Sequence, residues 1–486
     1  MKRLYILIIA VSLTILANGQ TQDQKVSGPM TLEQCIEYAL QNAISAQNAI
    51  VDQRIAAAKV KETIGIGLPQ VSGLASVQNN YNLRRFFTAY NPNGGFINLG
   101  DNPGIAPGTV IAAPNFFQLK NSADIGITIN QLLFNGSYLV GLKASSTYRE
   151  LSAKAANQTR EQIVMQVTKA YYAVLINKER ASLFTSNIAR VDTLLRNTKA
   201  LNTNGLAEEI DVDRIQVTYN NLLAERDKFL NLNDLGMELL KFQMNYPMDQ
   251  PIDVAGNIED VKVEATITTY KEGFDYSQRP DFQVLQVNRR AQELVIKNQY
   301  AGALPVLGAV ANLGYFTQSP DIAGLFSTNS DFSNASDAVK ANFGTDKYYG
   351  YSLFGVNLSM NIFTGFQRHY RIQQEKLNLA KIDNNFRGLK NAIDLEVKQA
   401  SVNFDNAIKS LTAQTANMEL AGKVARVTKI KYQQGVGSNL EVVDAENSLR
   451  TAQTNYYSAL FDAMVAKTDL EKAFGRLVPS SSSQSK

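Results

Sequence analysis

The side chains that most often carry out chemistry are scarce in this 486-residue chain. It has one histidine, His369, one cysteine, Cys35, and no tryptophan. A single imidazole excludes a multi-histidine zinc site, and a single thiol excludes both a disulfide within the chain and a cysteine-based metal cluster. The sequence also contains no nucleophile-elbow motif and no phosphate-binding loop. We therefore expect no enzymatic activity and no catalytic residue, metal or cofactor, and we expect Cys35 to be a small buried apolar residue.

The charged residues give no sign of a nucleic-acid partner. The 48 basic and 44 acidic residues give a net charge of +4 and are spread along the chain without a basic block. A protein that binds nucleic acid usually concentrates its basic residues in one patch or stripe. The hydrophobic content of 45% is high enough for a packed structure, so a disordered chain is not expected either.

Residues 1–19 have the pattern of a signal peptide. Lys2 and Arg3 precede a mostly apolar stretch that ends at Ala17, and Ala17 and Gly19 are small residues at a suitable cleavage point before Gln20. An uncleaved signal anchor is the alternative. No later run of 18 apolar residues exists, so we do not expect a helical inner-membrane protein. The mature chain is then either soluble outside the cytoplasm or inserted in an outer membrane as strands.

Most of the chain has helical periodicity. One heptad seam repeats at spacings of four and three residues through Ala445, Leu449, Ala452, Tyr456, Ala459, Ala463, Ala466, Leu470 and Ala473. The segments 163–174 and 393–411 show the same spacing. No proline interrupts residues 137–203, and a helix of that length would reach on the order of 100 Å at about 1.5 Å per residue. The sequence therefore predicts long helices in coiled-coil packing.

Four segments have the two-residue alternation of strands. They are residues 68–81, 124–134, 306–316 and 352–363, and the last alternates most regularly, with Phe354, Val356 and Leu358 between small or polar residues. Each has about the ten residues that a tilted strand needs to cross a bilayer. Aromatic residues lie near the strand ends and could form interfacial girdles: Tyr81, Phe134, Tyr315, Tyr351 and Phe363. Half-buried strands of a soluble sheet are the alternative.

The sequence repeats itself after about 230 residues, which indicates a duplication. Residues 67–69 (Gly-Leu-Pro) match 303–305 (Ala-Leu-Pro), and 134–136 (Phe-Asn-Gly) match 363–365 (Phe-Thr-Gly). Each half reads as helix, strand, loop, strand, long helix, glycine turn and helix. The predicted parts are a first repeat (20–246) with outer loop 82–123 and tip turn 204–206, a linker (247–271), a second repeat (272–475) with outer loop 317–350 and tip turn 434–438, and a disordered tail (476–486).

Four strands are too few to close a membrane barrel, since the smallest such barrels have about eight. Open strand edges cannot face lipid, because their backbone groups would lack hydrogen-bond partners. Several chains must then share one barrel. Three chains would supply 12 strands, and this is the smallest assembly that leaves a lumen. The geometry leaves a dimer or a tetramer open.

These features together resemble the TolC-like outer-membrane efflux protein family, also called outer membrane factors. The resemblance covers about residues 30–475 and is carried by Met30–Leu40, by Arg279-Pro280-Asp281-Phe282 and by 432–445 around the second tip turn. It implies a homotrimer with a 12-stranded outer-membrane β-barrel continued by a long periplasmic α-helical barrel. The implied function is the outer-membrane channel of a tripartite efflux or type I secretion system. Such a channel passively conducts substrates from a periplasmic adaptor (membrane fusion) protein and an inner-membrane RND, ABC or MFS transporter.

The resemblance also implies a gate at the periplasmic tip. Members of the family place carboxylates and a tyrosine there, and the matching residues are Glu441, Asp444, Asp211 and Tyr432, beside the tip turns at Gly205 and Gly435. Glu441 and Asp444 are three residues apart and so share one helix face. In a trimer they would form two cation-selective rings, whereas the alternative is an ordinary acidic first turn that complements the helix dipole.

Tyr432 is a candidate gate latch to Asp211, with simple packing as the alternative. Gly437 stands where the family often has an arginine, which puts one gate ion pair in question. His369, just after the fourth strand, is expected to be an interfacial or lumen residue. A different class of function, an exported periplasmic coiled-coil structural or interaction protein, would also explain the heptads. Cell fractionation distinguishes this alternative from the channel.

Overall fold

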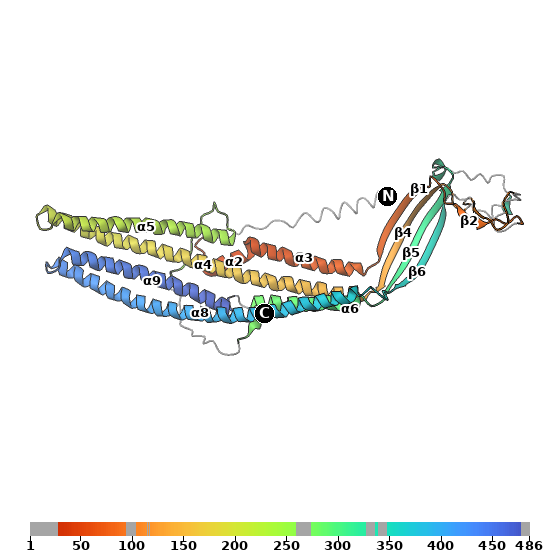
Figure 1. The fold of residues 1–486 in the computed structure, drawn as a ribbon. Helices are drawn as coiled ribbons and strands as arrows, with labels where there is room; N and C mark the ends of the chain where they lie inside the picture. Colours follow the sequence, from red (N-terminus) through yellow and green to blue (C-terminus); the bar gives the residue numbers. More distant parts are fainter. Residues whose placement is uncertain are drawn as a thin grey trace, which may run out of the picture. The chain divides into compact units, whose positions relative to one another are not determined.

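The computed structural model describes residues 28–93, 104–113, 115, 117–258, 274–326, 336–338 and 348–477. The predicted signal peptide, part of the predicted linker and nearly all of the predicted tail therefore lie outside the described residues. The helices are α2 (Leu32–Asn42), α3 (Ile44–Ile66), α4 (Gly136–Thr203), α5 (Glu209–Met244), α6 (Pro280–Ala301), α8 (Gln367–Gln433) and α9 (Asn439–Ala473) (Figure 1). The strands are β1 (Gln70–Asn79), β2 (Phe86–Ala89), β3 (Val110–Ala113), β4 (Asn121–Phe134), β5 (Val306–Ser319) and β6 (Tyr349–Ser359).

The two halves of the chain have the same order of elements. In the first half, two strands are followed by a 68-residue helix, α4, and a 36-residue helix, α5. In the second half, β5 and β6 are followed by a 67-residue helix, α8, and a 35-residue helix, α9. This near-identity confirms the predicted duplicated unit of helix, strand, strand, long helix and helix. No helix among the described residues is both long and apolar enough to cross a membrane.

The chain divides into two compact units. Unit 1 contains Met1–Gln53, Leu151–Gln286 and Asn384–Lys486, and its described part is helical apart from short connections. Unit 2 contains Arg54–Glu150 and Val287–Asp383 and includes all the strands. The four long strands of unit 2 form one antiparallel sheet in the order β1-β4-β5-β6, so β1 and β6 are its open edges within the chain.

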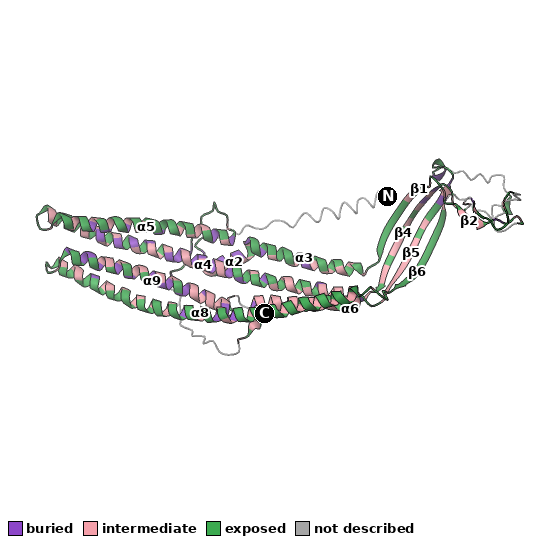
Figure 2. Cartoon of the chain, viewed as in Figure 1, coloured by how far each residue is buried: buried purple, intermediate pink, exposed green. Residues whose placement is uncertain are grey.

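The register of this sheet separates an apolar face from a polar one. Val71 pairs with Ile129, Ile129 with Ala311 and Ala311 with Phe354, which makes a continuous apolar row. The adjacent row, on the opposite face, runs through Ser72, Thr128, Asn312 and Leu353 and is mostly polar. The apolar face is not covered, since Val71 is 66% exposed and Phe354 is 74% exposed. Strands β1 and β6 are largely exposed (Figure 2). A soluble half-buried sheet would cover that face with another layer.

The predicted outer loops contain structure that the sequence analysis did not predict. Within 82–123, β2 and β3 pair as a two-stranded antiparallel ribbon. Their sequences, Phe-Phe-Thr-Ala and Val-Ile-Ala-Ala, contain β-branched and aromatic residues but are too short for alternation to stand out. The sheet also extends further at this end than predicted, because Tyr349 and Tyr351 of β6 pair with Phe316 and Gly314 of β5.

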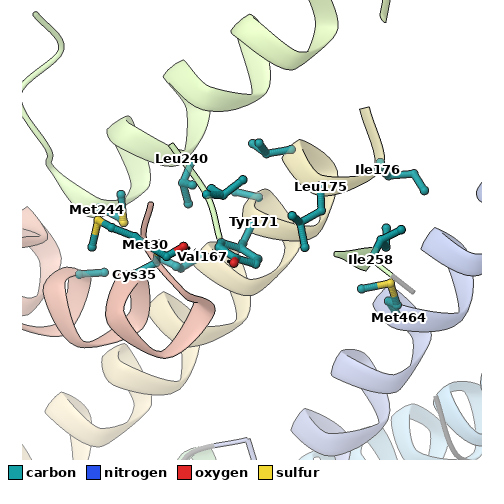
Figure 3. Close-up of a cluster of buried hydrophobic side chains, with 14 of the residues drawn as sticks. Met30, Cys35, Val167, Tyr171, Leu175, Ile176, Leu240, Met244, Ile258 and Met464 are labelled. Carbon is teal, nitrogen blue, oxygen red and sulfur yellow. Dashed lines mark hydrogen bonds between the residues drawn. The ribbon is translucent and has the colours of Figure 1, made fainter. Parts of the chain in front are cut away.

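The largest core of unit 1 joins α2, α4, α5 and α9 (Figure 3). Cys35, Val167, Leu240 and Met464 are all buried in it, as predicted for Cys35. The Tyr171 hydroxyl donates a hydrogen bond to the carbonyl of Ala255, which fixes the chain after α5 against α4. Burial raises the pKa of the Cys35 thiol to about 12, so this thiol stays protonated and unreactive at neutral pH.

A buried arginine organises a second region of unit 1. Arg279 is 3% exposed and pairs with Asp281 at 2.6 Å and with Glu396 at 2.9 Å. Its Nη1 donates to the carbonyl of Ala473 at 3.1 Å, at the end of α9. The guanidinium thereby ties the start of α6 to α8 and to the C-terminus of α9. This accounts for the Arg-Pro-Asp motif as a structural feature, because five donors are satisfied at one buried point.

Candidate functional site: the helical tips and the contact between hairpins

Unit 1 ends in two helical hairpins whose turns have the same geometry. Gly205 and Gly435 adopt positive φ angles of 72° and 74°, which a residue with a Cβ seldom adopts. The residue after each glycine donates its N–H back across the turn, Leu206 to Leu201 at 2.9 Å and Val436 to Lys431 at 3.0 Å. Each glycine therefore closes a helix C-terminus and reverses the chain.

The helices after these turns begin differently. Ser438 caps α9, since its hydroxyl accepts a hydrogen bond from the N–H of Glu441 at 3.2 Å. Glu208, at the equivalent position before α5, makes no side-chain cap. Glu441 is thus in the first turn of α9, where its charge complements the helix dipole. The dipole explanation and the predicted ring are both compatible with this position.

Glu441 and Asp444 lie on the exposed face of α9. Both side chains are exposed, whereas the neighbouring Val442, Val443 and Ala445 are buried against the rest of unit 1. In the described part of the chain, neither carboxylate forms an ion pair with a basic side chain. The two charges are therefore presented together to the space outside the chain, and their role as a ring stays a prediction.

The other two predicted gate residues are not joined to each other in the chain. Asp211 forms an ion pair with Arg214 at 3.8 Å. Tyr432 is half-buried before the turn, and among the described residues no hydrogen bond links its hydroxyl to Asp211. The link between the two tips is made by Asn439 instead, whose Nδ2 donates to the carbonyl of Asp211 at 3.1 Å. The latch between Tyr432 and Asp211 therefore stays a prediction.

A row of polar contacts joins the two hairpins along α4 and α9. The pairs are Lys169 with Asp469 at 2.5 Å, Arg180 with Ser458 at 2.5 Å, Asn187 with Gln453 at 3.1 Å, and Arg190 with Glu446 at 3.4 Å. Burial lowers the pKa of Arg180 below its ordinary value, and Asp462 opposes this effect. One buried atom of this contact, Nε of Arg180, has no partner among the described residues, and neither has Oδ1 of Asn439, where α9 meets α5.

The contact within the first hairpin is of a different kind. Phe184 of α4 stacks on Phe229 of α5 with ring centroids 5.4 Å apart. The surrounding buried cluster is supplied by α4 and α5, with one residue, Val443, from α9. Near the tip, apolar burial holds α4 to α5, whereas polar groups make most of the contact between α4 and α9; further along, the buried core also joins α4 to α9. The polar contact near the tip is expected to separate more easily.

The family model described as outer membrane efflux protein matches residues 276–476. This segment is an outer membrane efflux protein domain. The resemblance to the TolC-like family that the motifs indicated is confirmed, and the first repeat supplies a second copy of the same order of elements.

Curated outer membrane proteins are similar over most of the chain. The outer membrane protein TolC of Vibrio cholerae is 22% identical over 359 residues, which cover 72% of this chain and 76% of that protein. The probable efflux pump outer membrane protein TtgC of Pseudomonas putida is 22% identical over 360 residues, covering 73% of this chain and 69% of that protein. Both names place these relatives in the outer membrane.

Solved structures share the fold. CusC aligns with a TM-score of 0.68 and 16% identity over 91% of each chain. The outer membrane protein VceC of Vibrio cholerae aligns with a TM-score of 0.66 and 14% identity over 91% of this chain and 96% of that one. The open state of the Neisseria gonorrhoeae MtrE outer membrane channel aligns with a TM-score of 0.67 and 16% identity over 91% of this chain and 88% of that one.

Sequence reasoning missed the contact between the two hairpins of this chain. The heptads correctly predicted that Ile163, Val167, Ala170 and Val174 are buried. They gave no signal for Arg190, Asn187 or Asn439, whose partners lie more than two hundred residues away. An available clue was the antiparallel order of polar residues along α4 and α9. The departure at Gly437 has a structural counterpart, since a Cβ there would lie 3.2 Å from the backbone nitrogen of Tyr432.

Proposed function

We propose that this chain forms the outer-membrane channel of a tripartite efflux or type I secretion system. The channel would passively conduct substrates from a periplasmic adaptor protein and an inner-membrane transporter to the outside. One observation carries the proposal: a four-stranded sheet with an uncovered apolar face and two open edges, on a chain whose other unit consists of long paired helices. In water, the sheet of a single chain would expose its apolar face. In lipid, the backbone groups of its two open edges would lack hydrogen-bond partners.

The open edges support a homotrimer. If β6 of one chain pairs with β1 of the next, three chains give 12 strands and every strand is paired on both sides. The apolar rows then face lipid and the polar rows face the lumen. The exposed aromatic residues near the strand ends, among them Tyr81, Tyr315 and Tyr351, support interfacial girdles. Within the chain, the last strand of the first repeat (β4) pairs with the first strand of the second repeat (β5). Pairing of β6 with β1 of the next chain would repeat this arrangement between chains.

The tips support a gate. In a trimer, Glu441 and Asp444 would form two rings of three carboxylates, which attract cations and repel anions. The gate would open as each second hairpin moves away from the first along the polar contact between α4 and α9. The apolar cluster between α4 and α5 would keep the first hairpin intact during that movement. Tyr432 and Asp211 would add a latch between neighbouring elements when the gate is closed.

The tip turns also support docking of a periplasmic adaptor protein. Leu206 and Val436 occupy equivalent positions after the two turn glycines, and each is 76% exposed. Exposed apolar side chains at matching places of two hairpins suit a repeated contact with a partner. The inner-membrane transporter would be of the RND, ABC or MFS class, and the similarity to TtgC, named an efflux pump protein, supports an efflux role. Export to the outer membrane would use the cleaved segment 1–19.

The proposal is tested by fractionation followed by electrical recording. We expect the mature protein in the outer-membrane fraction, and we expect the detergent-purified protein to give discrete conductance steps in planar lipid bilayers. Release with the soluble periplasm would favour a periplasmic coiled-coil protein instead. Absence of conductance from a correctly localised, folded preparation would contradict the channel.

A further inference from the structure

A polar cavity lies in unit 2 beside the first turn of α8. Its volume is about 200 Å³, and its walls come from the start of α4, the end of α6, the segment after β6 and the first turn of α8. The lining residues that could bind a ligand are Ser137, Asn298, Gln299, Asn361, Arg368 and Arg371. No acidic residue is part of this lining among the described residues. The cavity thus combines two positive charges with several neutral hydrogen-bonding groups.

The two arginines of the cavity, unlike the two arginines of α6, have no counter-charge among the described residues. On α6, Arg289 pairs with Asp383 at 2.8 Å and Arg290 pairs with Glu150 at 2.6 Å. Arg368 donates to the carbonyl of Gly302 at 2.8 Å. Within the described ranges, neither Arg368 nor Arg371 forms an ion pair with a carboxylate. Their positive charge is therefore uncompensated at the cavity.

The position of the arginines on the helix adds to this imbalance. The first turn of α8 contains no acidic residue. A helix N-terminus already has a positive partial charge, and basic residues there are unfavourable unless an anion is close. The hydroxyl of Ser137 and the amides of Asn298, Gln299 and Asn361 can donate hydrogen bonds to anionic oxygens from the other walls.

The internal repeat has no arginine at the two matching positions. Phe363-Thr364-Gly365 before α8 matches Phe134-Asn135-Gly136 in sequence, although Gly136 is already the first residue of α4. At the same offset, the residues that correspond to Arg368 and Arg371 are Leu139 and Leu142. The two strand-to-helix connections also differ in length, since one residue separates β4 from α4, whereas residues 360–366 separate β6 from α8. The two arginines are thus particular to the longer connection of the second repeat.

We propose that this cavity binds a phosphate group, with Arg368 and Arg371 supplying the charge and the amides completing the hydrogen bonds. The planar fork of arginine matches the oxygens of a phosphate. A phospholipid headgroup and inorganic phosphate both offer this chemistry. The lipid source rests on the proposed function: the cavity lies where β4 and β6 end and β5 begins, and strands that cross a bilayer end at the headgroups.

The test measures binding to the full-length protein in detergent. Native mass spectrometry with added phosphatidylglycerol, and calorimetry with inorganic phosphate, are compared for the wild type, R371Q, R368Q/R371Q and the control R387Q. Arg387 is exposed on α8 outside the cavity, so its substitution removes the same charge. We expect the double variant to bind at least about tenfold more weakly, equivalent to about 1.4 kcal/mol, and R387Q to bind like the wild type.

The outcomes separate the sources. Diacylglycerol, which has the acyl chains without phosphate, should not bind at the site. Preference for phosphatidylglycerol supports a lipid headgroup, whereas equal or better binding of inorganic phosphate supports a soluble anion. If R371Q and the double variant bind both phosphatidylglycerol and inorganic phosphate as tightly as the wild type does, the proposal is overturned. Arg371 has no hydrogen-bond partner among the described residues, so R371Q remains informative if the double variant fails to fold.

Electrical recording of the same preparations separates this inference from the proposed function. A wild type that conducts but whose phosphate binding does not depend on Arg368 and Arg371 refutes only the phosphate site. A wild type that does not conduct but loses phosphate binding in R371Q refutes only the channel.

Discussion

At the scale of single residues, the tips show which features a sequence can reveal. Gly205 and Gly435 were predictable because a reversal between two helices needs a positive φ, and glycine supplies it. The shared face of Glu441 and Asp444 followed from their spacing. The role of Asn439 was not predictable. Its side chain donates a hydrogen bond to the carbonyl of Asp211, and these two residues, far apart in the sequence, come together only when the helices pack. Neighbouring residues determine the local geometry of a turn, whereas a contact between the hairpins depends on how both hairpins pack.

The carboxylates at the tip give the first prediction. The variant E441Q/D444N removes two negative charges per chain, so we expect the cation-to-anion permeability ratio to fall about fivefold, as about 1 kcal/mol of lost attraction would produce. Reversal potentials in planar bilayers with a salt gradient measure this ratio. D249N is a control, because Asp249 is an exposed carboxylate in the turn after α5. Unchanged reversal potentials in E441Q/D444N would reject the ring assignment.

Glu161 gives a prediction about pH. This residue of α4 is 7% exposed, and burial raises its pKa while Arg279 counteracts the effect. A carboxyl with a raised pKa stabilises the folded protein below its unfolded pKa, and this contribution is lost as pH rises through the folded pKa. We therefore expect E161Q to raise the unfolding temperature at neutral pH by roughly a few degrees. Its unfolding temperature should also depend less on pH than that of the wild type in that window, measured by circular dichroism.

The neighbouring Glu396 is a control with the opposite sign. Burial opposes its ionisation, but Lys472 and Arg279 together lower its pKa below the ordinary value. Its stabilisation is therefore present above the unfolded pKa and is lost as pH falls through the folded pKa. E396Q should lower the unfolding temperature at neutral pH. If E161Q and E396Q change stability in the same direction, the assignment of Glu161 is wrong.

At the scale of elements, each long helix has two different neighbours. The heptads predicted burial along α4 and α9 but did not say which helix covers which stripe. The structure shows that α4 contacts α5 through an apolar cluster and α9 through a row of polar pairs as well as buried side chains. A periodic apolar pattern is compatible with several pairings, because any helix with a similar stripe can satisfy it. The polar contacts between α4 and α9 select one of these helix pairings, and they allow the two helices to separate near the tip.

The polar contact predicts a change in gating. R190Q removes the ion pair with Glu446, in which the side chain of Arg190 is 35% exposed and that of Glu446 is 12% exposed. A partly exposed pair of this kind contributes up to about 1 kcal/mol. We expect the open probability of single channels to rise about fivefold, which is the change that 1 kcal/mol produces. R196Q is the matched control, since Arg196 pairs with Asp192 on the exposed side of α4. Equal gating of R190Q, R196Q and wild type would show that this contact does not hold the gate closed.

At the scale of the whole molecule, the sheet explains why the chain needs copies of itself. Its strands were predictable from alternation, and their order followed only from the structure, which pairs β4 with β5 across the duplication. The extra ribbon of β2 and β3 was missed, because four-residue strands have too little alternation to be recognised. The register places most of the apolar residues of the four strands on one face, so the chain has an uncovered apolar face and two unpaired edges.

The last prediction concerns the number of chains. Each open edge exposes a row of backbone N–H and C=O groups, and in lipid each unsatisfied group costs several kcal/mol, so an isolated four-stranded sheet cannot be the membrane form. Two chains would close an eight-stranded barrel that its own side chains fill, and three chains are the smallest number that leaves a lumen. We expect light scattering of the detergent-purified protein to give a protein mass three times that of the mature chain. A particle of two chains would contradict a conducting barrel, and a particle of four would contradict the trimer while leaving the pairing of β6 with β1 intact.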